Sequence, residues 1–178
     1  MSLVLAVRHR GVVHMMADSG IFDDDSCIVS KDPKVFIRGQ LLVGCVGGLR
    51  QIQVVREVWE PPKAPRSAEH LPRYMVTGVA ETLRIALRAS GASKAEHQQD
   101  SMEVKLLIGV RGRLFMANED LAVVEVSGES EAIGRCQELA RGALLASAGE
   151  IRQRLAATMS ICAEHGRAVR KPFVYVKA

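Results

Sequence analysis

The sequence predicts an α+β fold, a four-layer αββα sandwich in which two antiparallel sheets pack face to face between outer helices. Two observations lead to this prediction. Segments with a β pattern and segments with helical periodicity follow one another in the order strands, two helices, strands, two helices, strand. Two stacked sheets with one helix pair on each outer face satisfy that order. The chain has 178 residues, 48% of them hydrophobic, which suits a single domain over residues 1–178.

The first half of the chain begins with a hairpin and ends in two amphipathic helices. The β-rich runs 3–7 and 12–17 flank the turn 8–11, so a hairpin begins almost at the first residue. Residues 19–25 and 61–72 are polar or proline-rich and are expected to be loops. The remaining elements expected here are short strands near 27–29 and 34–36, a buried strand at 41–48, and helices at 49–59 and 74–89.

The second half repeats the pattern of strands followed by helices. Residues 90–101 are polar and are expected to form a linker. The elements expected after it are strands at 104–108, 114–116 and 121–126, helices at 131–146 and 148–163, and a closing strand at 173–176.

Composition excludes several classes of function. The net charge is +4, and the basic residues are scattered singly with few aromatics between them, which argues against a nucleic-acid groove. The four cysteines have no paired spacing, so they indicate buried thiols in a reducing, cytoplasmic compartment rather than disulfides or a zinc site. We therefore expect no metal and no cofactor. No apolar run approaches the roughly 20 residues that cross a bilayer, and the first residues do not resemble a secretory signal.

Ser2 carries the first chemical hypothesis. It follows the initiator methionine directly, and methionine aminopeptidases cleave before small residues such as serine. Removal of Met1 would leave a hydroxyl and a free α-amine on one residue. That amine, whose pKa is about 8, can accept the hydroxyl proton and so activate the oxygen as a nucleophile. Because Met-Ser is a common protein start, the hypothesis depends on the residues around it.

Several short motifs, weak singly, together resemble the proteasome β-subunit family in order and spacing. The likeness is closest to the bacterial proteasome-like protease subunit HslV and related bacterial proteasome homologues. The motifs are Gly11 and Asp18 in the hairpin, Lys34-Val35, and the segments 44–48, 118–121, 127–128, 148–151 and 160–162. The resemblance implies an N-terminal nucleophile hydrolase fold and a self-compartmentalising endopeptidase that hydrolyses polypeptides. It also implies a homo-oligomer of stacked rings of six or seven subunits, with an ATPase unfoldase ring as a possible partner.

The resemblance also assigns roles to individual residues. The family nucleophile, ordinarily threonine, falls on Ser2, and its catalytic aspartate and lysine fall on Asp18 and Lys34. A buried lysine there would lower the pKa of the hydroxyl and stabilise negative charge. The other implied roles are an oxyanion-binding amide at Gly48, a serine that bonds the N-terminal amine at Ser127, and substrate contacts from Ile21, Phe36 and Gly47.

Two other functions remain open at this point. One is a catalytically silent structural subunit of a proteasome-like ring, although such subunits carry an additional helix before the first strand. The other is an amidohydrolase of the same fold that acts on small amides; those enzymes are usually longer and often use cysteine, whereas position 2 is serine.

Overall fold

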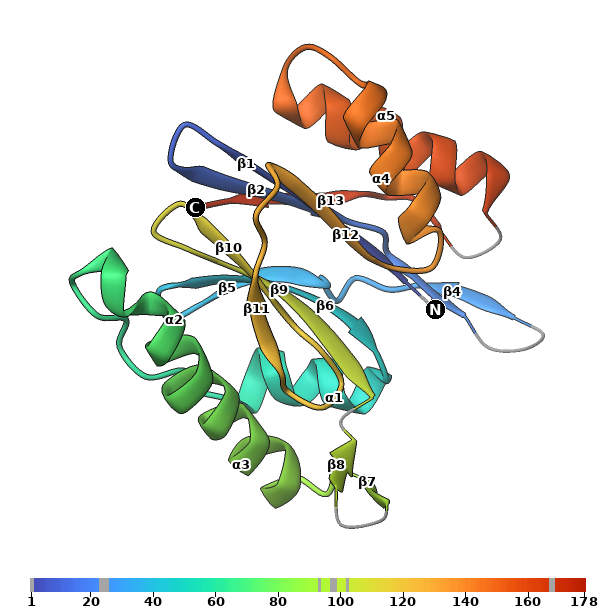
Figure 1. Cartoon of the computed structure of the whole chain (residues 1–178). Coiled ribbons are helices and arrows are strands. Elements are labelled where there is room, and N and C mark those ends of the chain that lie inside the picture. Colours follow the sequence, from blue (N-terminus) through green and yellow to red (C-terminus); the bar gives the residue numbers. More distant parts are fainter. Residues whose placement is uncertain (1, 23–25, 93, 97–98, 102, 167–168) are drawn as a thin grey trace.

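The computed structural model describes residues 2–22, 26–92, 94–96, 99–101, 103–166 and 169–178. Its largest elements are two antiparallel sheets (Figure 1). One has four strands in the order β12-β1-β2-β13, and the other has five in the order β11-β10-β9-β6-β5. The prediction of an α+β fold with antiparallel sheets is confirmed.

The four-stranded sheet is built around the predicted hairpin of β1 (Leu3–His9) and β2 (Val12–Ala17). The turn between them places Arg10 and Gly11 at positive φ, which glycine adopts without steric cost. On the outer sides, β12 (Ser130–Gly134) pairs with β1, and β13 (Val174–Lys177) pairs with β2. The sheet thus joins the two ends of the chain.

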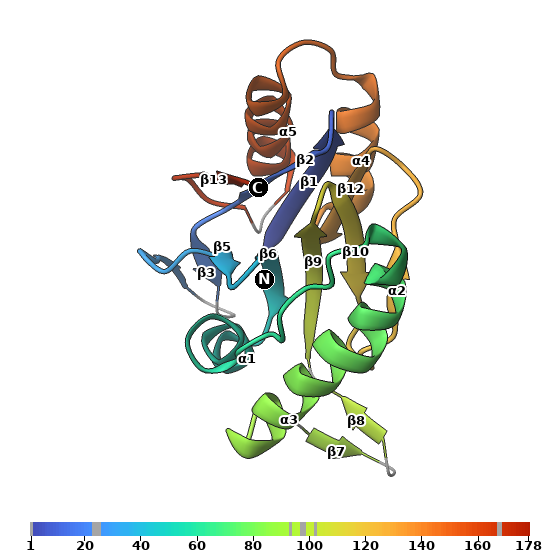
Figure 2. The same ribbon diagram turned by 90° about the vertical axis from the view of Figure 1, so that its left-hand side faces the viewer.

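The five-stranded sheet has β6 and β9 at its centre. Its strands are β5 (Val35–Arg38), β6 (Leu41–Gly47), β9 (Val104–Val110), β10 (Arg113–Ala117) and β11 (Val123–Glu125). Two smaller hairpins stand apart: β3 (Gly20–Phe22) with β4 (Cys27–Val29), and β7 (Lys94–Glu96) with β8 (Gln99–Ser101). In both ribbon views β7 and β8 lie beyond α3, away from the two large sheets (Figure 2).

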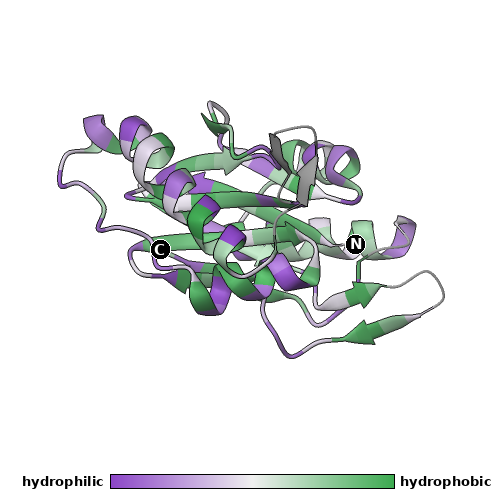
Figure 3. Ribbon diagram, turned by 90° about the horizontal axis from the view of Figure 1, so that it is seen from below, coloured by the Kyte–Doolittle hydropathy of each residue, from purple (hydrophilic) through white to green (hydrophobic). Residues whose placement is uncertain are grey.

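The helices form two groups on opposite sides of the sheets. α4 (Gln137–Ala146) and α5 (Ile151–His165) lie beside the four-stranded sheet (Figure 1). The other group covers the five-stranded sheet and consists of α1 (Leu49–Gln53), the π-helical η1 (Val54–Val58), the short 3-10 helix η2 (Ala68–His70), α2 (Leu71–Tyr74), the π-helical η3 (Met75–Ala80) and α3 (Glu81–Ala89). Figure 3 shows mostly hydrophobic strands between helices of mixed character.

Three hydrophobic clusters connect these elements, and β1 shows how. Leu3, Leu5 and Val7 pack with side chains of α4 and α5, whereas Val4 and Ala6 pack with side chains of the five-stranded sheet. This alternation is the period of two expected of a strand that is buried on both faces. The third cluster lies between the five-stranded sheet and α1–α3, around Trp59.

Three sequence predictions are corrected. The helix expected at 131–146 begins only at Gln137, because residues 130–134 form β12 against β1. The loop expected at 19–25 contains β3, and the linker expected at 90–101 contains β7 and β8. In the described part of the chain, no helix is both long and apolar enough to cross a membrane.

Candidate active site

Ser2 lies at the start of β1 and lines a pocket of about 410 Å³. Its backbone carbonyl accepts a hydrogen bond from the Arg135 amide (2.8 Å), just beyond the end of β12. Only 6% of the residue is exposed. The pocket is lined by Ser2, Val46, Gly47, Lys105, Glu119, Gly134, Arg135 and Gln137. Met1, whose removal the nucleophile hypothesis requires, lies outside the described residues.

Asp18 and Lys34 form a buried ion pair next to Ser2. The Lys34 Nζ donates to Asp18 Oδ1 at 2.9 Å and to the Gly20 carbonyl at 2.5 Å. The same Asp18 oxygen accepts the amide of Leu3 (3.0 Å), the residue that follows Ser2. A single carboxylate oxygen therefore links the Lys34 ammonium to the backbone of the predicted nucleophile. Asp18, which the family resemblance grouped with Ser2 and Lys34, thus contacts both Lys34 and the residue next to Ser2.

Burial and pairing act on Lys34 in opposite directions. Burial lowers the pKa of the Lys34 ammonium, because the charged form loses its hydration. The Asp18 carboxylate raises that pKa through its charge and its hydrogen bond, but it offsets only part of the effect. Lys34 is thus a cation that gives up its proton more readily than an exposed lysine does.

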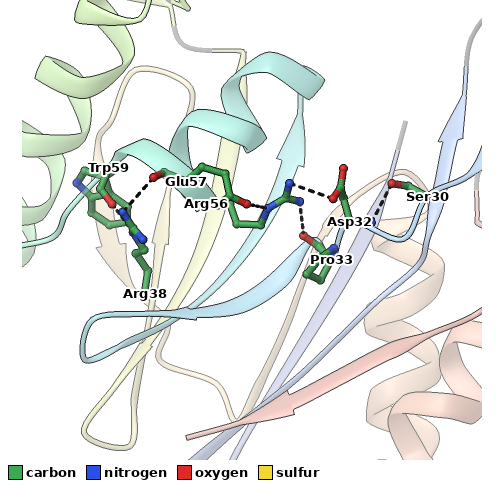
Figure 4. A network of polar contacts seen from close by, with 7 residues as sticks. All are labelled: Ser30, Asp32, Pro33, Arg38, Arg56, Glu57 and Trp59. Atoms are coloured by element: carbon green, nitrogen blue, oxygen red, sulfur yellow. Dashed lines mark hydrogen bonds and ion pairs between the residues drawn. The ribbon is translucent and has the colours of Figure 1, made fainter.

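A polar network holds the segment that leads into Lys34 (Figure 4). The Arg56 guanidinium, from η1, contacts the Asp32 carboxylate at 3.2 Å and donates to the Pro33 carbonyl at 3.4 Å. The Asp32 amide in turn donates to Ser30 Oγ at 3.0 Å. A side chain of η1 therefore contacts Asp32 and Pro33, the two residues immediately before Lys34, and holds them in place.

The turn after β6 gives a mixed result for the predicted glycines. Gly47 lines the pocket and has φ of +133°, and a Cβ there would lie 2.0 Å from the Glu103 carbonyl oxygen, so only glycine fits. The Gly48 amide donates to that same Glu103 oxygen at 2.9 Å. The predicted oxyanion donor is therefore already hydrogen-bonded in this structure.

Ser127 is not brought to Ser2, which corrects the sequence prediction. The Ser127 carbonyl accepts a hydrogen bond from Arg8 (3.2 Å), at the opposite end of β1. Ser2 and Arg8 are six positions apart along an extended strand, which is about 20 Å. The physical reason is β12: its five residues run antiparallel to β1 and carry the chain from the Ser127 end to the Ser2 end.

The two predicted apolar substrate contacts also lie elsewhere. Phe36 is 9% exposed and belongs to the hydrophobic cluster around Trp59, on the helix-facing side of the five-stranded sheet. Ile21 is half-buried in β3 and pairs with Ile28. Neither residue lines the pocket at Ser2. Alternation along β5 explains Phe36, since its neighbour Val35 faces the other sheet and Phe36 faces away from it.

Sequence reasoning missed the residues that β12 delivers to the site. Gly134 has φ of +103°, and a Cβ on it would lie 2.1 Å from the Ser2 carbonyl oxygen. Arg135 and Gln137 follow at the mouth of α4. The available signal was Gly134 itself, because a glycine inside a helical pattern weakens a helix prediction. Lys105, which reaches the pocket from β9, had no signal, and Glu119, from the loop after β10, lay in the motif 118–121 but was given no role.

Within the described residues, no group of three or more His, Cys, Asp or Glu side chains is arranged to hold a metal ion. Two of the three ionisable residues that line the pocket at Ser2 form an ion pair instead. Lys105 and Glu119 approach to 3.6 Å at the pocket.

Comparison with known proteins identifies the fold. No family model and no curated protein matches the sequence. Among solved structures, BPH from Thiobacillus denitrificans in complex with epoxomicin superposes with a TM-score of 0.80 at 17% identity, over 99% of this chain and 97% of BPH. HslV from Trypanosoma brucei gives 0.70 at 14% identity, over 98% of each chain. Anbu from Hyphomicrobium sp. strain MC1 gives 0.71 at 17% identity, over 99% of this chain and 81% of Anbu.

These structures share one architecture with this chain along nearly its whole length. The resemblance to HslV-like, proteasome-type subunits that the short motifs predicted is confirmed at the level of the fold. Sequence identities of 14–17% carry the fold and leave the chemistry to be argued from the site.

Proposed function

We propose that this chain is a subunit of a proteasome-type endopeptidase with Ser2 as an N-terminal nucleophile. The observation that carries the proposal is the Asp18–Lys34 ion pair, whose shared carboxylate oxygen also binds the amide next to Ser2. Burying two charges costs free energy and contributes little net stability. A buried pair of this kind, one residue away from Ser2 through the Leu3 amide, is more readily explained by chemistry than by folding.

The reaction follows from the groups at hand. Once Met1 is removed, the Ser2 α-amine takes the hydroxyl proton as Oγ attacks the substrate carbonyl carbon. The Lys34 ammonium stabilises negative charge on the hydroxyl oxygen, and backbone N–H groups at Gly47 and Gly48 stabilise the oxyanion. For Gly48 this requires release of the Glu103 carbonyl. The proton passes to the leaving amine, and water then hydrolyses the ester on Ser2.

The wider architecture is part of the same proposal. Three separate hydrophobic clusters, one between the sheets and one under each helix group, support the four-layer αββα sandwich of N-terminal nucleophile hydrolases. We place the enzyme in the cytoplasm, as a homo-oligomer of stacked rings that restricts access of polypeptides to Ser2. A ring ATPase that feeds the chamber fits this arrangement. Anbu from Pseudomonas aeruginosa forms a helical assembly, so an open helix is the competing geometry.

The test is covalent labelling of protein whose N-terminal serine has been verified by intact mass. A peptide epoxyketone such as epoxomicin requires both the hydroxyl and the amine of one residue. We expect a single adduct, located on Ser2 by tandem mass spectrometry and absent from Ser2→Ala. Cys27→Ser is the matched control, because Cys27 is an exposed thiol. An adduct on a cysteine, or equal labelling of Ser2→Ala, would contradict the proposal.

A negative result has its own meaning. If verified N-terminal serine gives neither an adduct nor cleavage of any peptide in a diverse library, the silent ring subunit becomes the better description. The structure offers a reason for such an outcome, because the Gly48 amide is already hydrogen-bonded to the Glu103 carbonyl and is not free to bind an oxyanion.

A further inference from the structure

The pocket at Ser2 carries charge that the proposed chemistry does not use. Beyond Ser2 and Gly47, its ionisable lining residues are Lys105, Glu119 and Arg135. Lys105 and Glu119 face each other at 3.6 Å and largely compensate one another. Arg135 is exposed, and among the described residues its guanidinium has neither an ion pair nor a hydrogen bond. One positive charge is therefore left over at the pocket.

The backbone fixes this arginine beside the nucleophile. The Arg135 amide donates to the Ser2 carbonyl at 2.8 Å, and the preceding Gly134 passes so close to that carbonyl that no side chain fits. The Arg135 Cα therefore cannot move away from Ser2 without breaking the edge of the sheet. The Arg135 side chain therefore stays at the pocket that Ser2 also lines.

The start of α4 lies at the pocket but already holds a negative group. Gln137 lines the pocket, and its side-chain amide donates to the Glu138 carboxylate in the same turn at 3.1 Å. Glu138 therefore occupies the end of the helix that favours a negative charge, and Arg135 is left as the pocket cation without a partner among the described residues. Ser2, a polar residue 6% exposed, faces the same space.

From these observations we propose that Arg135 is a specificity-determining residue that binds a carboxylate of the substrate. The inference rests on the proposed function and gives that site its substrate class, acidic peptides. A planar guanidinium suits a carboxylate because two parallel N–H groups bond its two oxygens. The carboxylate belongs either to a Glu or Asp side chain or to the C-terminus of a peptide.

The experiment measures binding, so that it does not depend on turnover. Ser2→Ala protein is titrated with fluorescent peptides that differ only in Glu against the isosteric Gln at each position of a hexapeptide, each made with a free and with an amidated C-terminus. We expect Glu peptides to bind about fivefold more tightly than Gln peptides, the size of a partly exposed ion pair. A preference that follows the free C-terminus instead assigns the carboxylate to the chain end.

Substitutions locate the effect. In Arg135→Met the Glu/Gln ratio should fall to near one, and in Arg135→Glu the protein should prefer Lys peptides. Arg66→Met, at an exposed arginine outside the pocket, is the matched control and should keep the ratio. Because the Arg135 amide is unchanged in both variants, the hydrogen bond to Ser2 survives.

Two outcomes overturn the inference: equal affinity for all Glu/Gln and acid/amide pairs, or a preference that survives in Arg135→Met. Failure of the proposed function is seen separately, in the epoxyketone experiment. A preference for carboxylate peptides without any labelling of Ser2 would support the Arg135 subsite and contradict the proposed peptidase function. Labelling of Ser2 without a carboxylate preference would support the peptidase function and contradict the Arg135 subsite.

Discussion

At the scale of the residue, the Asp18 carboxylate is unusually well satisfied. Besides the Lys34 ammonium it accepts the amides of Leu3, Gly20 and Arg170, at 3.0, 2.9 and 3.4 Å. Its side chain is fully buried. A buried carboxylate is tolerated when several N–H donors replace its water. The Asp18 carboxylate therefore keeps its backbone hydrogen bonds even when Lys34 is removed. For this reason the structural and catalytic roles of the ion pair can be separated by mutation.

We expect Lys34→Ala to abolish peptide cleavage and also to lower the free energy of unfolding by about 3 kcal/mol, since it leaves a buried charge without its partner. The double variant Asp18→Asn with Lys34→Met removes both charges and should recover most of that stability. It should not recover cleavage. Denaturant unfolding and peptide turnover, measured on both proteins, separate the structural role from the catalytic one. Wild-type turnover in a folded Lys34→Ala protein would show that the catalytic role is wrong.

The pH dependence of cleavage follows from two groups. The rate should rise as the Ser2 amine loses its proton, near pH 8. It should fall again when Lys34 loses its proton, and because burial lowers the pKa of Lys34, this fall comes below the ordinary lysine value of 10.5. A profile of kcat/KM against pH measures both limbs.

Lys34→Arg provides the control for that profile, because a guanidinium keeps its proton above pH 12. If the variant cleaves peptides, its alkaline limb should move to higher pH. An unchanged alkaline limb would assign the fall to another group.

At the residue scale, the sequence was informative about residues that lie close together along the chain. Ser2 and Asp18 flank the β1–β2 hairpin, whose period brings its two ends together, and Lys34 reaches Asp18 from just before β5. Ser127 was misplaced because its position depends on which segment pairs with β1, a long-range choice. Phe36 was misplaced because its neighbours do not reveal which face of β5 meets the helices.

At the scale of the element, β12 decides how the site is completed. Four of its five residues, 131–134, were predicted to be helical because residues 137–146 continue them with helical periodicity. The pairing with β1, and in particular Leu3 opposite Gly134, overrides that local preference. This pairing between distant segments cannot be predicted from the sequence of residues 130–134 alone.

The junction after β12 gives a matched pair of substitutions. Gly134 and Gly149 have nearly the same positive φ, +103° and +104°, but a Cβ would meet the Ser2 carbonyl oxygen at Gly134 and nothing within 4 Å at Gly149. Gly149→Ala should therefore cost only the backbone strain, about 1 kcal/mol. Gly134→Ala should cost at least about 2 kcal/mol more and abolish labelling of Ser2, because the start of β1 must shift.

Thermal unfolding and epoxyketone labelling of the two alanine variants test this prediction. Equal stability and equal labelling would mean that β12 does not hold Ser2 in place. Loss of both properties in Gly149→Ala as well would point to backbone strain rather than to the close approach.

At the scale of the whole molecule, exposed apolar side chains mark contact surfaces. Val76 and Ile85, on η3 and α3, are each 55% exposed, and Leu145 on α4 is 81% exposed. Leu49 on α1 and Val58 on η1 are exposed as well, so the helices over 49–59 and 74–89 carry more apolar residues than one buried face needs. Exposed apolar area of this kind is typical of subunit interfaces.

We expect native mass spectrometry to give the mass of a closed oligomer of about twelve or fourteen copies, which corresponds to two stacked rings of six or seven subunits. Ile85→Glu should reduce the mass, whereas Arg66→Glu, a charge change away from these helices, should not. A stable monomer or dimer that cleaves peptides at micromolar concentration would refute the compartment while sparing the chemistry. A polydisperse series of masses would favour a helical assembly instead.

The topology of the four-stranded sheet also determines how late in translation the surroundings of Ser2 can be completed. β2 receives its second neighbour only from Val174–Lys177, and Asp18 receives one of its donors from Arg170. While a ribosome is still translating the chain, the hairpin at its beginning keeps one edge unpaired and its carboxylate lacks a ligand. The surroundings of Ser2 and Asp18 are therefore complete only after residue 177 has emerged, so the proposed site is among the last parts of the chain to be finished.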